Sequence, residues 1–351
     1  MPLWKLRKEL PIMNNFAYQR EQDVNAAIAK VASGIDSKFI AGGTNIIDLL
    51  KYNLTIADTL VDINPISNYH TIEPTATGGL MLGALMTNAD TAYHPIIEQK
   101  YPLLSKAILA GASAQIRNMA TNGGNLLQRT RCYYFYDAAA PCNKRVPGSG
   151  CSAIPGYNRI MAVLGTSENC IAVFPSDMCV ALAALDASVH ISGPNGDRVL
   201  AFTDFHRLPG ETPHLDNNLQ HGELITGIEL PVKGFPQNYS YLKLRDRNSY
   251  AFALVSVATG LELEGDVIRE ARIALGGVAH KPWRVKDAEK SLIGKTANRE
   301  NFASAAEIIL AGAKGFEHNA FKIELAKKAI VRNCIMALNP STQLPGAQPS
   351  V

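Results

Sequence analysis

Apolar residues recur along the first part of the chain with two different spacings. Residues 23–32 and 45–51 repeat them every three to four positions, which is typical of amphipathic helices. Residues 38–41 and 59–63 are short apolar runs bounded by turn-forming residues, which predicts two strands. Together these segments predict a compact α/β unit over residues 16–65.

The middle of the chain alternates strands and helices around an irregular segment. We predict strands near residues 80–85, 188–191 and 224–230, and helix-like stretches over residues 103–114 and 175–185. Residues 130–172 show no periodic pattern and contain four Cys, four Tyr, four Gly and three Pro. Irregular segments of this length are uncommon in compact domains and are usually functional.

The last part of the chain predicts an antiparallel sheet followed by helices. The pattern predicts a meander and two amphipathic helices, over residues 241–244, 253–263 and 271–278, and over residues 302–313 and 321–337. The tail from Asn339 to Val351 is rich in Pro, Ser and Gln, so we expect it to be loose.

Composition narrows the class of protein. The chain has 351 residues, of which 47% are hydrophobic and 19% charged, as in globular proteins of two or three domains. The net charge of +3 is spread along the sequence, which argues against a nucleic-acid partner. No apolar run approaches the ~20 residues of a membrane span, and the chain start lacks the apolar core of a signal peptide. We therefore expect a cytoplasmic chain, unless a partner carries it across a membrane.

Two glycine pairs are candidate phosphate-binding turns. Residues 40–45 (IAGGTN) stand between a predicted strand and a predicted helix, where glycines leave backbone N–H groups free to hold an anion. Residues 121–125 (TNGGN) repeat this pattern. A plain turn explains the first pair equally well, and a helix C-cap explains the second. The pyrophosphate of a dinucleotide needs more than one phosphate-binding turn, so the two turns together point to a dinucleotide ligand.

Four cysteines gather in the irregular segment, namely Cys132, Cys142, Cys151 and Cys170. Their spacing lacks the close pair of a zinc knuckle and differs from that of bacterial ferredoxins. Their number matches the ligands of an iron–sulfur cluster, and two structural disulfides are the alternative. Spacing alone leaves both open. The other two, Cys179 and Cys334, stand in apolar helix-like stretches, so we predict core thiols.

Two charged residues could also serve a nucleotide. Asp177 stands at the start of a predicted helix, where it complements the helix dipole or accepts a hydrogen bond from a ribose hydroxyl. Lys243 lies in a predicted strand, where it is a solvent-facing charge or a cation that stabilises a reduced flavin.

These motifs together resemble a known family. Residues 39–46 (FIAGGTNI), 115–118 (QIRN), 121–125 (TNGGN) and 175–177 (PSD) occur in the order found in the FAD-binding subunits of xanthine oxidase and other molybdenum hydroxylases. The resemblance covers about residues 14–340. Residues 124–132 (GNLLQRTRC), 143–151 (NKRVPGSGC) and 274–284 (ALGGVAHKPWR) are similar to a subgroup, the FAD and 4Fe-4S subunits of bacterial periplasmic aldehyde oxidoreductases.

The resemblance implies an α+β fold in two parts. Residues 14–235 would form a two-subdomain FAD-binding fold of the vanillyl-alcohol-oxidase/PCMH type, and residues 236–340 an α+β domain with an antiparallel sheet and helices. The first part would divide into residues 14–65 and 66–235, with a cysteine-rich insertion at 130–172. Residues 1–13 would be an N-terminal extension and residues 341–351 a flexible tail.

The resemblance also implies site residues. Two runs would hold the FAD pyrophosphate and neighbouring groups, namely Phe39, Ile40, Ala41, Gly42, Gly43, Thr44, Asn45 and Ile46, and Thr121, Asn122, Gly123, Gly124 and Asn125. Leu109 would lie against the cofactor, Asp177 would bond the ribose or adenine side, Ile225 would pack on the flavin ring, and Lys243 would contact the flavin end. Cys132, Cys142, Cys151 and Cys170 would ligate a 4Fe-4S cluster.

The function so implied is that of an electron-transfer subunit. FAD would pass electrons to a terminal acceptor from a large molybdenum-cofactor subunit through a small 2Fe-2S subunit, in a heterotrimeric aldehyde oxidoreductase. We expect co-export to the periplasm with a signal-bearing partner, and the cytoplasm as the alternative. Two other functions stay open, a stand-alone FAD oxidoreductase with its own substrate and a disulfide-stapled assembly protein.

Overall fold

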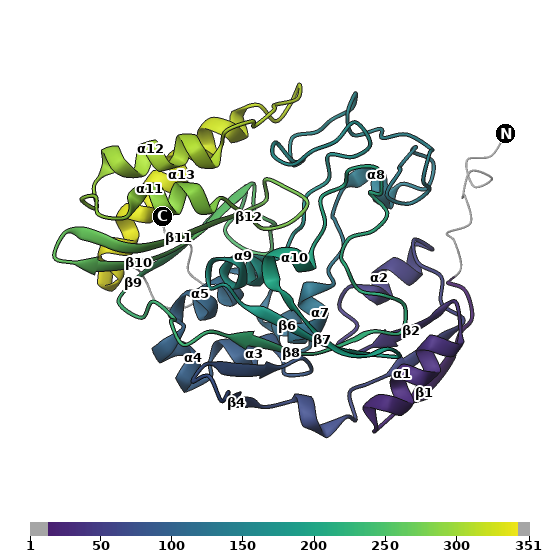
Figure 1. The fold of residues 1–351 in the computed structure, drawn as a ribbon. Coiled ribbons are helices and arrows are strands. Elements are labelled where there is room, and N and C mark those ends of the chain that lie inside the picture. The colour runs from purple at the N-terminus through teal and green to yellow at the C-terminus, as the bar shows by residue number, and fades with distance from the viewer. Residues whose placement is uncertain (1–12, 343–351) are drawn as a thin grey trace.

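The computed structural model describes residues 13–342, so the tail beyond residue 342 and most of the N-terminal extension lie outside the described residues. Three sheets follow one another along the chain, and helices pack between and around them (Figure 1). This arrangement confirms the predicted α+β class.

The first sheet is small and parallel. Its strands are β1 (Ala17–Arg20), β2 (Ser37–Ile40) and β3 (Thr59–Asp62), in the order β1-β3-β2. Helix α1 (Val24–Ser33) begins at Asp23, whose carboxylate accepts a hydrogen bond from the Ala26 N–H, and it buries Ala27, Ile28 and Val31. Helix α2 (Ile46–Lys51) follows β2 directly. The predicted helices and strands of this unit are confirmed, and β1 is an additional strand.

The second sheet has five antiparallel strands in the order β4-β5-β8-β6-β7. They are β4 (Ile72–Pro74), β5 (Leu80–Gly83), β6 (Ser188–Gly193), β7 (Gly196–Ala201) and β8 (Leu224–Leu230). The helices of this unit are α3 (Asn88–Ala92), α4 (Pro95–Lys100), α5 (Pro102–Ala110), α6 (Ala114–Arg117), α7 (Asn122–Leu126), α9 (Asp177–Ala184), α10 (Phe202–Phe205) and the 3-10 turn Ser67–Tyr69.

The third sheet belongs to the C-terminal domain. Its antiparallel strands are β9 (Asn238–Leu244), β10 (Val255–Glu264), β11 (Val267–Gly276) and β12 (Trp283–Arg284), in the order β12-β11-β10-β9. The sheet carries α11 (Lys286–Leu292), α12 (Arg299–Ile309) and α13 (Phe321–Leu338) on one face, and the turn Pro340–Thr342 follows. The predicted meander and both predicted helices are confirmed.

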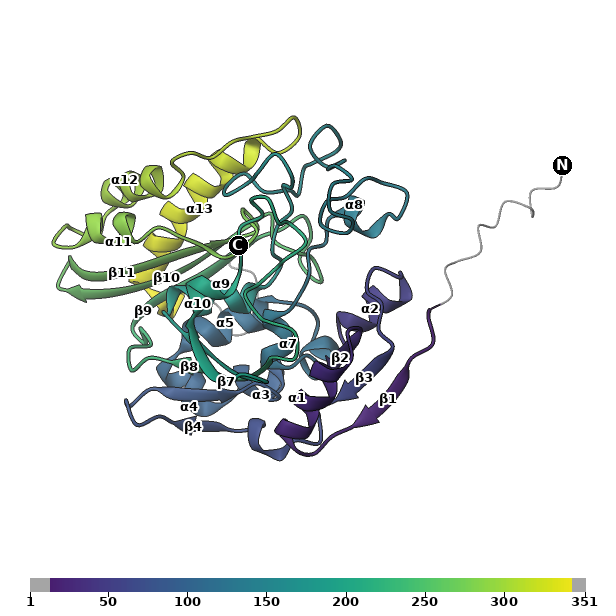
Figure 2. The ribbon, with the colours of Figure 1, turned by 45° about the vertical axis from the view of Figure 1, so that its right-hand side comes forward.

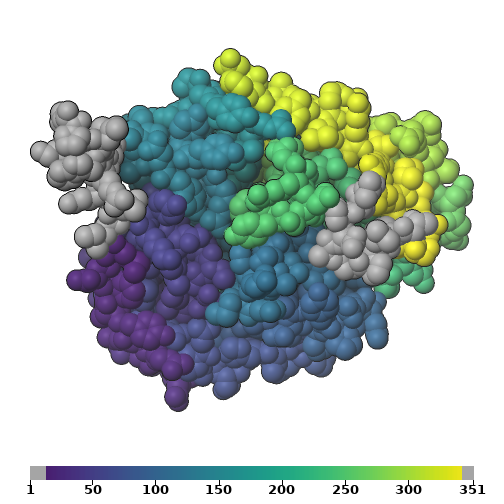
Figure 3. All heavy atoms as spheres, turned by 180° about the vertical axis from the view of Figure 1, so that it is seen from behind, coloured from purple at the N-terminus to yellow at the C-terminus, as the bar shows by residue number. Residues whose placement is uncertain are grey.

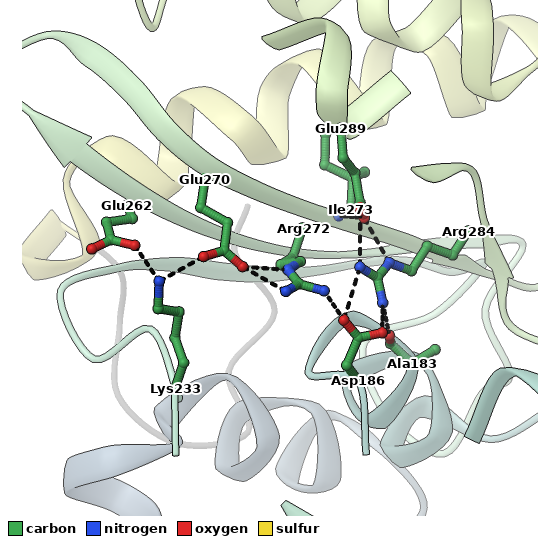
Figure 4. Close-up of polar contacts among 9 residues, drawn as sticks. All are labelled: Ala183, Asp186, Lys233, Glu262, Glu270, Arg272, Ile273, Arg284 and Glu289. Atoms are coloured by element: carbon green, nitrogen blue, oxygen red, sulfur yellow. Dashed lines mark hydrogen bonds and ion pairs between the residues drawn. The ribbon is translucent and has the colours of Figure 1, made fainter. Parts of the chain in front are cut away.

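Helix α9 lies at the interface between the two domains. Every residue of α9 is buried, and the helix packs against α5 on one side and against β10 and β11 on the other. A charged network lies beside it, in which Asp186 bridges Arg272 and Arg284 while Lys233 bridges Glu262 and Glu270 (Figure 4). The apolar helix and these ion pairs fix the C-terminal sheet on the unit built around the five-stranded sheet.

The cysteine-rich segment remains irregular, as predicted. Within residues 130–172 the only helix is α8 (Tyr133–Tyr136), and the segment folds as a set of loops beside α13 (Figure 2). Cys179 and Cys334 are fully buried core residues, which confirms that prediction. None of the helices in residues 13–342 combines the length and apolar character required to cross a bilayer.

Candidate functional site

The two glycine turns meet in the fold. A Cβ atom at Gly42 would overlap the carbonyl oxygen of Met119, just before the second turn, so only glycine permits this approach. Gly43 has a φ of +70°, in the left-handed region that favours glycine. The two glycine turns, about 80 positions apart in the chain, therefore lie directly against each other through their backbones.

Each turn leads into the first turn of a helix. The Thr121 hydroxyl accepts a hydrogen bond from the Gly124 N–H at 3.2 Å and thereby caps α7. The Ile47 N–H bonds the Gly43 carbonyl as α2 begins. Residues 121–125 thus start a helix, which overturns the alternative that they cap the end of one. The first-turn N–H groups of α7 already have acceptors, since those of Asn122 and Gly123 bond the Met86 and Ala84 carbonyls. Backbone N–H groups suited to an anion are therefore expected at the start of α2.

A first cavity of about 1070 Å³ opens along these turns. Most of the predicted FAD contacts line it, namely Phe39, Ile40, Ala41, Gly42, Gly43, Thr44, Asn45, Ile46, Thr121, Gly123, Gly124 and Ile225. Its lining is mainly apolar away from the turns, as an adenosine moiety requires.

A second cavity of about 1350 Å³ shares Thr44, Asn45 and Gly124 with the first. Three buried donors on its lining have no hydrogen-bond partner among the described residues, namely Asn45 Nδ2, Arg117 Nε and Arg131 Nε. Unpaired buried donors are costly and call for a ligand acceptor. Two cavities joined at an anion-binding turn match an extended dinucleotide, so these residues fit FAD.

Asp177 and Lys243 form one buried pair on the second cavity. Lys243 Nζ donates to Asp177 Oδ2 at 2.8 Å, and Tyr241 donates to the other carboxylate oxygen at 2.6 Å. Both members of the ion pair are nearly inaccessible to solvent. Asp177 and Lys243 therefore lie together on the second cavity, whereas Ile225 lines the first. The contacts expected of these three residues with the ribose and the flavin stay predictions.

Two of the expected site residues, Leu109 and Asn122, do not line either cavity. Leu109 is buried in the core of the FAD-binding unit, and its neighbours Ile108 and Gly111 line the second cavity instead. Asn122 is fully buried, and its amide bonds Thr91 at 2.8 Å and the Gly83 carbonyl at 3.2 Å. Leu109 thus packs the core and Asn122 braces the second turn, while Asn125 reaches the cavity.

The four cysteines converge on one small pocket of about 280 Å³. All are free thiols, three are buried, and Cys142 and Cys151 pair as an isolated β-bridge. The two-disulfide alternative is therefore not observed. Within residues 13–342, no three His, Cys, Asp or Glu side chains are grouped as ligands of a metal ion.

Backbone donors surround these sulfurs. The N–H groups of Tyr134 and Phe135 point at Cys132, and those of Ala153, Ile154 and Ile171 point at Cys151. Burial raises the pKa of Cys132 to about 11, whereas a hydrogen bond with Cys170 lowers the pKa of Cys151 to about 6. The pocket therefore favours the thiolate form of Cys151, and its backbone N–H groups can donate hydrogen bonds to the sulfurs of both Cys132 and Cys151.

A set of polar residues around this pocket was not predicted from the sequence. His280 Nε2 lies 3.3 Å from the Cys170 sulfur, and Lys144 pairs with Asp216. Burial lowers the pKa of His280 to about 3, so the ring is neutral. The proximity of Lys144 to Cys142 in the sequence was the only available signal, because His280 and Asp216 arrive from distant segments.

The segment after β9 closes the second cavity from the outside. Tyr250, Ala251 and Phe252 line it, and the Phe252 ring lies under the Arg131 guanidinium at 5.3 Å. From behind, this green segment lies on the surface between the teal cysteine-rich loops and the blue helices (Figure 3).

Two family matches cover most of the chain. Residues 14–233 match the family described as FAD binding domain in molybdopterin dehydrogenase, and residues 239–336 match the CO dehydrogenase flavoprotein C-terminal domain. The chain belongs to the FAD-binding subunits of the molybdenum hydroxylase family. Such subunits are parts of oxidoreductases. The first cavity lies within the residues that match the FAD domain, and the second is lined by residues of both domains.

Relatives of this FAD-binding subunit agree with that assignment. The aldehyde oxidoreductase FAD-binding subunit PaoB of Escherichia coli K12 is 46% identical over 91% of this chain and 96% of its own. The glyceraldehyde dehydrogenase medium chain of Sulfolobus acidocaldarius is 29% identical over 81% of this chain and 83% of its own. The structure of quinoline 2-oxidoreductase from Pseudomonas putida 86 superposes with a TM-score of 0.72 at 25% identity, covering 93% of this chain and 98% of that one.

Proposed function

We propose that this subunit carries FAD as the electron-transfer component of a molybdenum-dependent aldehyde oxidoreductase and that it also carries a 4Fe-4S cluster. The close approach of Gly42 to Met119, which joins two cavities at one anion-binding surface, supports the FAD site most directly. The 46% identity to an aldehyde oxidoreductase subunit supports the substrate class.

Bound FAD supplies both one- and two-electron redox chemistry. The chain contributes placement and charge. Backbone N–H groups of the first turn would hold the pyrophosphate against the glycines of the second, and Asn45 Nδ2 would donate to it from the junction of the cavities. The Asp177–Lys243 pair would meet the ring end, where the Lys243 ammonium favours added negative charge.

The cysteine pocket fits a 4Fe-4S cluster. Each thiolate of such a cluster binds a different iron, so the sulfurs stand farther apart than the ligands of one metal ion. Four free thiols that line one pocket supply the number of ligands that such a cluster needs. Backbone N–H groups aimed at Cys132 and Cys151 would stabilise ligating sulfur, as donors around iron–sulfur clusters do.

Partners follow from the same reasoning. Relatives of this chain are named as medium chains of dehydrogenases. We therefore propose a heterotrimer with a large molybdenum-cofactor subunit and a small 2Fe-2S subunit. Electrons would enter from the small subunit and leave to a terminal acceptor. Export to the periplasm with a signal-bearing partner is part of this proposal, and fractionation of cells that express the whole complex tests it.

A cofactor assay on the native complex tests the proposal. We expect one FAD and about four iron atoms in this subunit, beyond the iron of the small subunit. Cys151→Ser should lower the iron content, while Cys334→Ser should leave it unchanged, because Cys334 is buried in the C-terminal core. Unchanged iron in Cys151→Ser would disprove the cluster. Reduction of an acceptor by an organic donor with the isolated subunit would instead support a stand-alone oxidoreductase.

A further inference from the structure

A single carboxylate lies between the two proposed redox sites. Asp216 Oδ2 accepts a hydrogen bond from Arg129 Nε at 2.6 Å, and Asp216 Oδ1 accepts one from Lys144 Nζ at 2.5 Å. Asp216 comes from the long connection between α10 and β8, far in sequence from both partners. The contact therefore exists only in the folded chain.

Arg129 belongs to the FAD side of this bridge. It lines the first cavity, and its backbone N–H donates to Asn45 Oδ1 at 2.9 Å. Asn45 is one of the residues shared by the two cavities. The Arg129 guanidinium also lies over the Phe135 ring at 4.8 Å, at the edge of the cysteine pocket.

Lys144 belongs to the cysteine side. It lines the cysteine pocket two positions after Cys142, its side chain is 2% exposed, and its ammonium also bonds the Pro213 carbonyl at 2.8 Å. The positive charge of Lys144 acts on both Cys170 and His280. Charges so shielded from water interact more strongly than charges at the surface.

We propose that Asp216 is a positioning residue shared by the FAD cavity and the cysteine pocket, and that its carboxylate sets the charge experienced by both redox centres. This inference rests on the proposed function. Burial opposes ionisation of Asp216, yet Lys144 and Arg129 keep its pKa below the ordinary value, so the group is an anion at neutral pH. One anion is thus shared by two cations, and its removal leaves both positive charges uncompensated instead of one.

The consequence is a linked shift of both reduction potentials. Adding an electron is easier beside more positive charge, so Asp216→Asn should move the cluster potential and the flavin potential upward together. Asp186→Asn is the matched control, because Asp186 also bridges two cations but lines neither cavity nor the cysteine pocket. Both potentials should stay at the wild-type values in that variant.

The experiment is a redox titration of the holoenzyme complex, with electron paramagnetic resonance following the cluster and absorbance following the flavin. Arg129→Gln should lower the cluster potential, the opposite of the shift in Asp216→Asn, because it removes one of the two cations beside the Asp216 carboxylate. The double variant Asp216→Asn with Arg129→Gln should return it toward wild type. If Asp216→Asn does not retain its cluster, the decision rests on Arg129→Gln, in which the Asp216–Lys144 pair is intact.

The outcomes separate this inference from the proposed function. A wild-type complex without the additional four iron atoms would overturn the cluster and this inference together. A normal iron content with unchanged potentials in Asp216→Asn and Arg129→Gln would overturn only the role of Asp216. Potential shifts of equal size in Asp186→Asn would also overturn the role of Asp216, because they would show that the loss of any carboxylate moves the two potentials.

Discussion

A buried histidine links the stability of the FAD-binding unit to pH. His206 is 3% exposed, its ring packs against Phe174, Phe202 and Phe205, and its Nε2 lies 2.8 Å from the Leu126 carbonyl. Burial lowers the pKa of His206 to about 4. The folded protein thus holds a neutral ring directly behind the second glycine turn.

We predict that the free energy of unfolding falls as pH drops through the window from the unfolded pKa of about 6.5 to about 4. In that window the unfolded chain binds the proton that the folded chain excludes, so acid favours unfolding. In His206→Gln, the free energy of unfolding should change by ~3 kcal/mol less across this pH window than it does in wild type. Urea unfolding at a series of pH values measures this, and the exposed His214→Gln is the control. Identical slopes in wild type and His206→Gln would contradict the prediction.

The contact between Gly42 and Met119 gives a second prediction for a single residue. Gly42→Ala should separate the two turns, because the added Cβ would overlap a backbone carbonyl that cannot move independently. We expect flavin affinity to fall at least tenfold, or about 1.4 kcal/mol, as measured by flavin titration of the deflavinated complex.

The control for Gly42→Ala is another glycine substitution. Gly196 has a φ of +99° and open space around a Cβ atom, so Gly196→Ala should cost about 1–2 kcal/mol of stability and still retain flavin. Normal flavin binding by Gly42→Ala would show that the turns tolerate separation.

Among the elements, the junction beside α9 depends on charge. Arg284 is 2% exposed and bonds Asp186, Glu289 at 2.7 Å and the Ala183 carbonyl at 2.9 Å (Figure 4). Arg284→Met should destabilise the chain by about 3–5 kcal/mol, because it leaves the buried Glu289 carboxylate without its cation.

Thermal or denaturant unfolding measures the effect of Arg284→Met. Lys290→Ala removes an exposed pair on α11, with side chains 72% and 81% exposed, and should change stability by less than about 0.5 kcal/mol. Comparable losses in the two variants would contradict a special role for the buried pair.

The sequence pattern predicted the helices and strands that are buried on one face or on all sides. Helices α1, α9, α12 and α13 all follow predicted apolar runs. Strands β1 and β7 were missed because they lie at sheet edges and are mostly exposed, so they lack an apolar face. Polar α11 was missed for a related reason, since only three of its residues are buried.

The candidate site was predictable where a motif fixes the backbone. The two glycine turns carry their geometry in residues 40–45 and 121–125, so their role was visible in the sequence. The pairing of Asp177 with Lys243 was not, because it depends on how α9 packs against the C-terminal sheet. The Asp216 bridge likewise needs three distant segments to meet.

At the scale of the whole molecule, the last helix holds the cysteine-rich segment. Lys322 in α13 is fully buried, and its ammonium bonds the Met161 carbonyl at 2.7 Å and the Gly277 carbonyl at 2.6 Å. Asn319 bonds the Met161 and Ala162 carbonyls as well. The segment is therefore fixed by residues from the far end of the chain.

We predict that Lys322→Met loosens residues 130–172. Burial lowers the pKa of Lys322 to about 7. Two buried carbonyls would lose their hydrogen-bond donor, which costs about 1–3 kcal/mol. Limited proteolysis of the complex should then cut this segment faster than in wild type. The exposed Lys328→Met on the same helix should keep the wild-type cleavage rate, and equal rates in all three proteins would contradict the prediction.

The position of Lys322 also imposes an order on biosynthesis. The loops that present the four thiols are translated well before the α13 lysine that holds them in place. Insertion of the proposed cluster, if it requires the ordered loops, would therefore wait until α13 has been made, and until then the four cysteines would be open to oxidation.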